Sequence, residues 1–152
     1  MLIVLCGIPA SGKTSFTHWG FEKDVKVIST DKIRGELFGD ESIQRNPRLV
    51  FDTAYNRIAN ALQKNENVIF DATNLTIKDR KEIFKRFSPN VHEIIAVYFN
   101  TPLEVCLERN AKRERKVPED VIRRMHDRIQ EPTTEEGFSL TYKVYPNNQY
   151  FK

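Results

Sequence analysis

Residues 7–14 read Gly-Ile-Pro-Ala-Ser-Gly-Lys-Thr, which fits the pattern G-x-x-x-x-G-K-[ST] at every fixed position. A loop of this kind cradles the phosphates of a nucleotide, because glycine permits the turn and a following helix offers free backbone N–H groups. The apolar residues Leu2 to Cys6 directly before it predict a buried parallel strand, and a helical pattern begins near Lys13. A chance match is not expected to fall between a strand and a helix, so we interpret residues 7–14 as a phosphate-binding loop.

Two side chains of this loop carry the expected nucleotide chemistry. We expect the ammonium of Lys13 to contact the β and γ phosphates of ATP, and the hydroxyl of Thr14 to ligate Mg²⁺. ATP is therefore the expected donor substrate and Mg²⁺ the expected cofactor. The residues of the loop expected to bind the nucleotide are Gly7, Ala10, Ser11, Gly12, Lys13, Thr14 and Ser15.

Strand-like and helix-like patterns alternate along the rest of the chain. The predicted strands are residues 2–6, 25–29, 67–71, 93–99 and 138–145, and the predicted helices begin near Lys13 or span residues 32–38, 47–62, 77–87, 102–112 and 118–130. This alternation predicts an α/β fold, a three-layer sandwich with a mostly parallel central sheet and helices on both faces. Because no repeat or linker interrupts the 152 residues, we expect a single domain over residues 1–152.

The charge of the chain is concentrated in one segment. The whole sequence has 24 Lys and Arg against 21 Asp and Glu, a net charge of +3, whereas residues 109–116 hold five basic residues and one acidic residue. That segment alone therefore carries 5 − 1 = +4, and the remainder sums to 3 − 4 = −1. We expect a nucleic acid, if one binds, to be held at its end by few contacts.

Several features predict a cytoplasmic protein. No apolar run approaches the roughly 20 residues needed to span a bilayer, and no basic leader precedes the first strand. Cys6 and Cys106 stand a hundred positions apart without metal-ligand spacing, which favours a reduced intracellular environment. Trp19 is assigned to core packing, Tyr142 and Tyr145 either to packing or to the border of the adenine, and the oligomeric state stays open.

Polar residues follow the second and third predicted strands, at the edge of a parallel sheet where ligands bind. Asp31 could accept a proton from an acceptor hydroxyl, and Arg34, one helical turn further on, could hold a phosphate beside it. The alternative is that Asp31 or Thr30 caps the next helix, and the sequence does not decide between these two readings.

Asp71 closes the third predicted strand, where a carboxylate suits Mg²⁺ or its water shell. The alternative is again a cap, since Asn74 or Thr76 could begin the following helix. A phosphate loop in the same chain favours the metal role for Asp71, because the magnesium ligand of such a site must lie at this position.

The basic segment follows the fourth predicted strand, in the place of a lid over the nucleotide. If the segment is helical, Arg109 and Arg113 share one face, and two guanidinium groups there suit the capture of phosphate oxygens. The alternative is a solvated surface. We favour a lid over residues 109–117, which we call the lid segment.

These motifs together make the chain similar to the kinase domain of the polynucleotide 5′-kinases, the P-loop phosphotransferases of nucleic-acid repair. The resemblance spans residues 2 to about 145. It is carried by residues 7–14, the pair Asp31 and Arg34, residues 71–75 followed by Arg80, residues 105–110 followed by Arg113, residues 117–118 and 121–123, and residues 136–138.

The resemblance implies a role for each matching residue. Lys13 and Thr14 would bind the ATP phosphates and Mg²⁺, and the lid residues Arg109 and Arg113 would contact the donor phosphates. Asp31 would be the general base toward a 5′-hydroxyl, and Arg34 would grip the phosphate that flanks the acceptor nucleotide. The remaining matches, also expected at the substrate or metal site, are Asp71 and Asn74.

The sequence thus predicts a P-loop kinase that transfers the γ-phosphate of ATP to the 5′-hydroxyl end of RNA or DNA. The alternative within enzymes is a kinase of a small molecule or of a nucleoside monophosphate. The third alternative is a nucleotide-binding switch that has no acceptor. Asp31 and Arg34 argue against it, because a switch needs no acceptor base.

Overall fold

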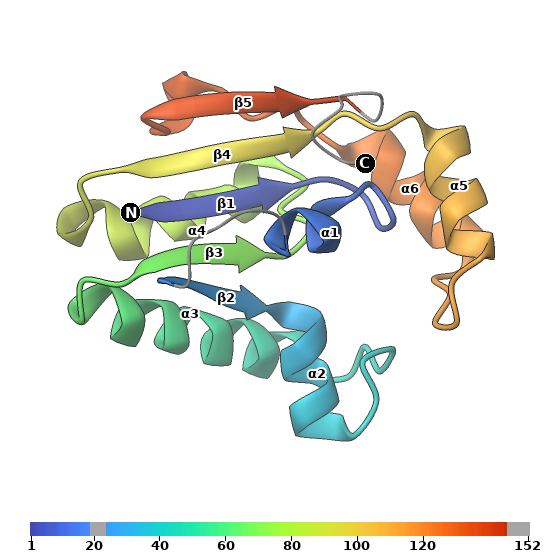
Figure 1. Cartoon of the computed structure of the whole chain (residues 1–152), viewed down its shortest axis with the longest axis horizontal. Coiled ribbons are helices and arrows are strands. Elements are labelled where there is room, and N and C mark those ends of the chain that lie inside the picture. The colour runs from blue at the N-terminus through green and yellow to red at the C-terminus, as the bar shows by residue number, and fades with distance from the viewer. Residues whose placement is uncertain (19–23, 146–152) are drawn as a thin grey trace.

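A five-stranded parallel sheet organises the computed structural model, which describes residues 1–18 and 24–145 (Figure 1). Its strands are β1 (Leu2–Cys6), β2 (Val25–Ser29), β3 (Asn67–Asp71), β4 (Ile94–Phe99) and β5 (Leu140–Val144), in the order β2-β3-β1-β4-β5. Every pair of neighbouring strands is parallel. The predicted α/β class is confirmed, and the sheet is wholly rather than mostly parallel.

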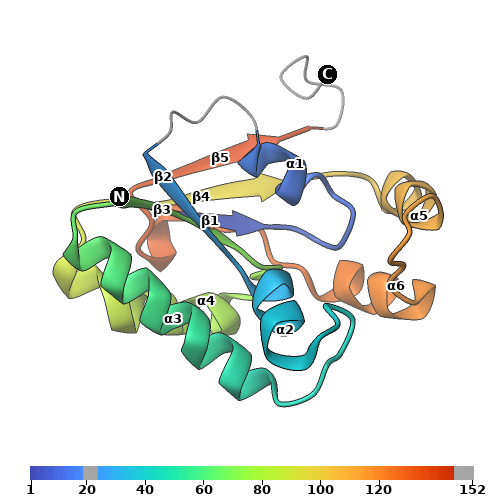
Figure 2. The same ribbon diagram turned by 60° about the horizontal axis from the view of Figure 1, so that its bottom comes forward.

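Helices lie on both faces of the sheet, as predicted. The helices are α1 (Lys13–Thr17), α2 (Thr30–Phe38), α3 (Pro47–Gln63), α4 (Ile77–Phe87), α5 (Leu103–Ala111) and α6 (Glu119–Arg128), and short 3₁₀ turns are η1 (Ser88–Asn90) and η2 (Thr134–Glu136). Helices α3 and α4 cover one face and α1 lies on the other (Figure 2). Helices α2, α5 and α6 lie toward the carboxyl ends of the strands (Figure 1). No helix in the described part of the chain is both long and apolar enough to cross a membrane.

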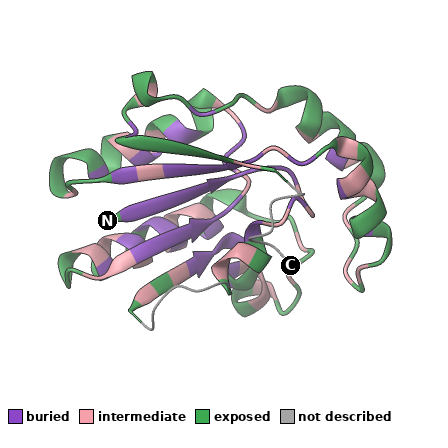
Figure 3. Cartoon of the chain, turned by 45° about the horizontal axis from the view of Figure 1, so that its top comes forward, coloured by how far each residue is buried: buried purple, intermediate pink, exposed green. Residues whose placement is uncertain are grey.

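The period-2 alternation of the strands divides the core between the two faces. Val4 and Phe70 pack with residues of α3 such as Ile58, whereas Leu5 and Ile69 face the side on which Phe16 of α1 packs. The central strand β1 is buried along its whole length, and the edge strand β5 is largely exposed (Figure 3). The apolar interior therefore fixes β1, and with it the loop that follows.

The structure corrects several predicted boundaries. Helix α2 begins two residues earlier than expected, because the hydroxyl of Ser29 accepts a hydrogen bond from the N–H of Lys32 and so caps it. Strand β5 is shorter than predicted at both ends. Trp19 lies outside the described residues.

The expected helical lid is only partly present: Arg109 lies in a helix and Arg113 does not, so the condition under which the two would share one face is not met. Helix α5 ends at Ala111 and α6 begins at Glu119. The side chain of Asn110 explains the break, because its amide donates to the carbonyl of Val117 at 2.7 Å and its oxygen accepts from the N–H of Val117 at 2.9 Å. These two bonds close the chain between the helices into a loop, which carries Arg113.

Candidate active site

The phosphate loop connects the buried end of β1 to the first turn of α1. Gly12 has a φ of 110°, in the left-handed region that favours glycine. A Cβ atom added to Gly7 would lie 2.6 Å from Oγ of Ser11 and 3.1 Å from Cβ of Phe99, which leaves no room for a side chain. The two fixed glycines of the motif are thus required for different reasons, one by backbone conformation and one by close packing.

Lys13 is buried at the base of this loop. Its Nζ atom donates to the carbonyl oxygens of Gly7 at 2.8 Å and Ile8 at 2.9 Å. Burial lowers the pKa of the Lys13 amine, and the negative charges of Asp71 and Asp31 oppose that shift. The ammonium is therefore bonded to the phosphate loop, and the charges of Asp71 at the end of β3 and Asp31 in α2 act on it.

Asp71 and Thr14 form the contact between β3 and α1. The Thr14 hydroxyl donates to Oδ2 of Asp71 over 3.2 Å, and the carboxylate is 6% exposed. Burial raises the pKa of Asp71, and Lys13 and the hydrogen bond from Thr14 oppose the rise. Asp71 is not a helix cap, because Thr76 caps α4 in a reciprocal pair with Asp79. A buried carboxylate beside a hydroxyl is an oxygen donor set that fits Mg²⁺.

A pocket of about 410 Å³ opens over the phosphate loop. Its lining consists of Ala10, Ser11, Gly12, Lys13, Thr14, Ser15, Phe99, Thr101, Arg109, Arg113, Val144 and Tyr145. The fold therefore brings the loop and both predicted lid arginines to one cavity, although the two arginines do not share a helix. Arg109 also donates from Nη1 to the carbonyl of Ala10 at 3.5 Å.

Three further residues of this pocket are Thr101, Tyr145 and Ser11. The sequence alone did not identify Thr101, assigned Tyr145 either to packing or to the border of the adenine, and predicted Ser11. Thr101 donates from Oγ1 to the carbonyl of Ser11 at 2.8 Å and so supports the loop from the segment after β4. Tyr145, 47% exposed, borders the cavity. Oγ of Ser11 is buried without a hydrogen-bond partner in the described residues, beside the space that phosphate oxygens would occupy.

Asp31 lies in the first turn of α2, and Ser29 rather than Asp31 or Thr30 caps that helix. Oδ1 of Asp31 accepts from Nη1 of Arg34 at 2.7 Å. Its Oδ2 accepts from Nη2 of Arg115 at 3.1 Å. The Asp31 side chain remains 45% exposed, so a ligand can reach it from solvent. Arg115 was missed as a site residue, because only tertiary structure brings the lid segment to α2.

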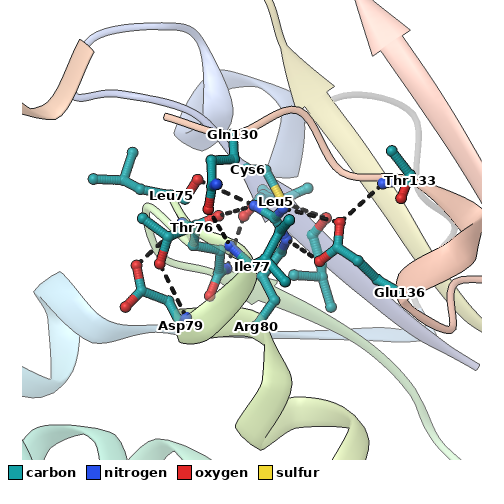
Figure 4. Close-up of polar contacts among 12 residues, drawn as sticks. Leu5, Cys6, Leu75, Thr76, Ile77, Asp79, Arg80, Gln130, Thr133 and Glu136 are labelled. Atoms are coloured by element: carbon teal, nitrogen blue, oxygen red, sulfur yellow. Dashed lines mark hydrogen bonds and ion pairs between the residues drawn. The ribbon is translucent and has the colours of Figure 1, made fainter. Parts of the chain in front are cut away.

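Asn74 and Arg80 lie behind the site rather than in its cavity. The buried amide of Asn74 donates to the carbonyl of Leu5 at 2.8 Å. Arg80 is fully buried, donates to the carbonyls of Asn74 and Leu75 at 2.9 and 3.1 Å, and pairs through two hydrogen bonds with Glu136 (Figure 4). These contacts hold the segment that directly follows β3, the strand that ends at Asp71.

The same segment is tied to the phosphate loop. The N–H of Gly7 donates to the carbonyl of Thr73 at 3.0 Å. Strands β2 and β3 are also in register at their ends, where Ser29 lies opposite Asp71. The phosphate loop is therefore bonded to the segment after Asp71, and Asp31 comes two residues after Ser29 at the neighbouring strand end.

Comparison with known proteins identifies the family and the fold. A family model described as an AAA domain (AAA_33) matches residues 2–132. The chain is 29% identical, over 147 residues, to the L-seryl-tRNA(Sec) kinase of Methanococcus maripaludis, an alignment that covers 92% of this chain and 56% of that protein. It is 24% identical to the bifunctional polynucleotide phosphatase/kinase of Schizosaccharomyces pombe, over 94% of this chain and 33% of that protein.

Solved structures share the same architecture. A chain of the Pnkp1/Rnl/Hen1 RNA repair complex matches with a TM-score of 0.76 at 23% identity, over 91% of this chain and 46% of that chain. The present chain thus spans about half the length, or less, of these relatives. At this identity the match shows the shared P-loop kinase fold.

Proposed function

The chain belongs to the AAA domain family of P-loop kinase-like proteins, and from this premise we propose that it is a polynucleotide 5′-hydroxyl kinase. In this proposal residues 1–152 form one kinase domain whose lid segment closes over the donor. The enzyme transfers the γ-phosphate of ATP to the 5′-hydroxyl end of RNA or DNA.

One observation carries the acceptor half of the proposal. Asp31 is half-exposed, its Oδ1 accepts a hydrogen bond from Arg34 at 2.7 Å, and its negative charge acts on the buried amine of Lys13 in the phosphate loop. A carboxylate in this place suits the removal of a proton from an acceptor hydroxyl. The adjacent guanidinium suits a phosphate next to that hydroxyl, which a nucleic-acid end supplies.

The donor half follows from the pocket over the phosphate loop. Arg109 and Arg113 line the cavity from the lid segment, and Lys13 and Ser11 line it from the phosphate loop. These cations would neutralise charge on the phosphoryl group while Asp31 takes the acceptor proton. In the transfer, a bond forms from the acceptor oxygen to the γ-phosphorus, the bond from that phosphorus to the bridging oxygen breaks, and ADP leaves.

Thr14 and Asp71 would hold Mg²⁺, Thr14 through its hydroxyl and Asp71 directly or through a bound water. A metal held there would supply positive charge that neutralises the donor phosphates. The 3.2 Å contact between these two side chains supports the assignment, since both can face the same ion. Asp31 and Arg34 then form the acceptor site, and Asn74 contributes by holding the segment that directly follows Asp71.

The proposal is tested by incubation with ATP labelled at the γ-phosphate and a panel of acceptors. The panel contains 5′-hydroxyl RNA and DNA oligonucleotides, the same oligonucleotides with a 5′-phosphate, and nucleoside monophosphates. We expect label only on the 5′-hydroxyl oligonucleotides. Transfer to a monophosphate but to no oligonucleotide would contradict the polynucleotide assignment and support a small-molecule kinase.

A second candidate is favoured by the relative with 29% identity, whose name describes phosphorylation of a seryl group on a tRNA. The same base and arginine could act on an aminoacyl hydroxyl beside the 3′ end of a tRNA. Adding seryl-tRNA to the acceptor panel distinguishes the two. ATP hydrolysis without any labelled acceptor would instead indicate a nucleotide-binding switch.

A further inference from the structure

We propose that Arg115 is a positioning residue of this site, which reaches from the lid segment to α2 and holds the carboxylate of Asp31 toward the acceptor hydroxyl. The inference rests on the proposed function, in which Asp31 is the base. It adds a residue that neither the sequence motifs nor the nucleotide pocket identify.

The contacts of Asp31 come from two directions. Arg34, from the same helix, occupies Oδ1 at 2.7 Å, and Arg115, from a segment 84 positions away, occupies Oδ2 at 3.1 Å. With one guanidinium on each oxygen, the carboxylate plane is fixed. Each carboxylate oxygen has room for a second hydrogen bond, so a hydroxyl can still donate to Asp31.

Arg115 is itself held by a second acid. Its Nε atom lies 3.3 Å from Oε2 of Glu41, in the segment between α2 and α3. Glu41 packs against α2 at Gly35, where an added Cβ would lie only 3.1 Å from Cγ of Glu41. The guanidinium therefore lies between two carboxylates, one of which is fixed to the helix that carries Asp31.

This arrangement differs from the ordinary ion pairs of the lid region. The Arg115 side chain is 30% exposed. By contrast, Lys112 is 75% exposed and pairs with Glu108, which is 69% exposed and lies four residues earlier in the chain. Pairs of that second kind contribute little to stability or geometry. The long-range, partly buried pair of Arg115 is the one able to position another residue.

The lid segment connects this contact to the donor pocket. Asn110 closes the segment through its two bonds to Val117. Within it Arg113 lines the nucleotide pocket, and Arg115, two residues further on, contacts Asp31. The same short loop therefore contributes one residue to the nucleotide pocket and another to the contact with Asp31. The orientation of Asp31 thus depends on the loop that closes over ATP.

The first test is the variant Arg115→Ala, with Lys112→Ala as the matched control that removes a cation from the same loop. Because misplacing a reacting group by about 1 Å costs up to about 100-fold, we expect kcat to fall about 10- to 100-fold in Arg115→Ala. The KM for ATP should stay within about twofold of wild type, since Arg115 does not line the donor pocket.

Arg115→Lys, which keeps the charge but can reach only one acid, should restore part of kcat. A wild-type kcat in Arg115→Ala would overturn the inference, as would a loss equal to that in Lys112→Ala.

The second test asks whether Arg115 acts through Asp31. In an Asp31→Asn background, measured in single turnovers with excess enzyme, adding Arg115→Ala should change the residual rate less than about twofold. Fully multiplicative losses would show that Arg115 acts independently of the carboxylate, and would overturn the positioning role.

A third measurement needs no phosphoryl transfer and so separates this inference from the proposed function. Trypsin cleaves after basic residues of the lid segment, and the rate reports how firmly the segment is held. We expect Asp31→Asn and Glu41→Gln to accelerate that cleavage several-fold, and Glu108→Gln, which frees only Lys112, to leave it unchanged. Equal rates in all variants would overturn the inference. If the wild type labels no oligonucleotide but trypsin still cleaves Asp31→Asn faster, only the acceptor assignment is overturned.

Discussion

The hydroxyl of Thr14 donates a hydrogen bond to Oδ2 of Asp71 over 3.2 Å, although 57 positions separate the two residues in the chain. This contact joins the phosphate loop to the end of β3 and places a hydroxyl and a buried carboxylate side by side. Because Asp71 is buried next to Lys13, its charge is also coupled to the stability of the protein.

Asp71 should give the nucleotide-free protein a distinct pH dependence of stability. Burial raises the pKa of Asp71 above the ordinary 3.8, so the folded protein retains this proton at a pH where the unfolded chain has lost it. Stability therefore falls as pH rises between the two pKa values and levels off above the folded one. We expect the free energy of unfolding of wild type, relative to Asp71→Asn, to fall as pH rises from about 4 in urea titrations. A difference that does not vary with pH would contradict the buried carboxylate.

The same substitution tests the proposed metal site. Mg²⁺ together with ATP should raise the melting temperature of wild type more than ATP with EDTA does, because a ligand that binds only the folded state stabilises it. Asp71→Asn should lose that Mg²⁺-dependent increment. An increment of wild-type size in the variant would place the metal elsewhere.

Asp31→Ala should nearly abolish phosphoryl transfer while ATP still binds. A positioned base contributes about 10² to 10⁴-fold to the rate, so a loss of that size is expected in single turnovers. The Kd for ATP should be unchanged, since Asp31 does not line the nucleotide pocket. The exposed Asp127→Ala serves as control, and unchanged turnover in Asp31→Ala would contradict the assignment of the base.

We expect Arg34→Ala to weaken binding of the acceptor more than binding of ATP. A hydrogen bond to a charged group contributes about 1.5 to 3 kcal/mol, so the KM for a 5′-hydroxyl oligonucleotide should rise at least about tenfold. The KM for ATP should change little. Arg57→Ala, which removes an exposed arginine paired with Glu36 on the far end of α2, is the matched control. Equal losses for both substrates would count against an acceptor-binding arginine.

Arg109→Ala and Arg113→Ala should each slow the transfer step. Arginines that contact a transferring phosphoryl group contribute large factors, and a loss of at least about tenfold in single-turnover rate is expected for each. Arg123→Ala, on the exposed face of α6 with Glu119, controls for removal of a nearby positive charge. Rates like those of wild type would identify the lid segment as solvated surface.

Arg80 should matter for stability rather than for contact with substrate. It is fully buried and paired with Glu136, and removing one partner of such a pair leaves an uncompensated charge at a cost of about 3 to 5 kcal/mol. We expect Arg80→Ala to lose that much in urea denaturation. The double variant Arg80→Met with Glu136→Leu should recover a large part of the lost free energy of unfolding. A loss below about 1 kcal/mol in the single variant would contradict the buried pairing.

The helices and strands could be predicted because their patterns are local. The boundaries of β2 at Val25–Ser29, of β3 at Asn67–Asp71 and of α4 at Ile77–Phe87 agree with the prediction. Each is a run of one periodicity ended by a cap or a polar residue. Near the site, the early start of α2 and the loop after α5 both arise from side chains that bond to backbone groups, Ser29 and Asn110.

By itself, the sequence of this protein determined the P-loop kinase fold and predicted a set of candidate site residues. The motif at residues 7–14 could be recognised because its glycines and lysine are needed at fixed spacing along a continuous chain. Only the tertiary structure decided which of those residues meet. The pairing of Asp71 with Thr14, of Asp31 with Arg115, and of both lid arginines with one pocket depends on strand register and on the loop after α5. Contacts of this kind join residues distant in sequence through packing, and no local spacing in the chain encodes them.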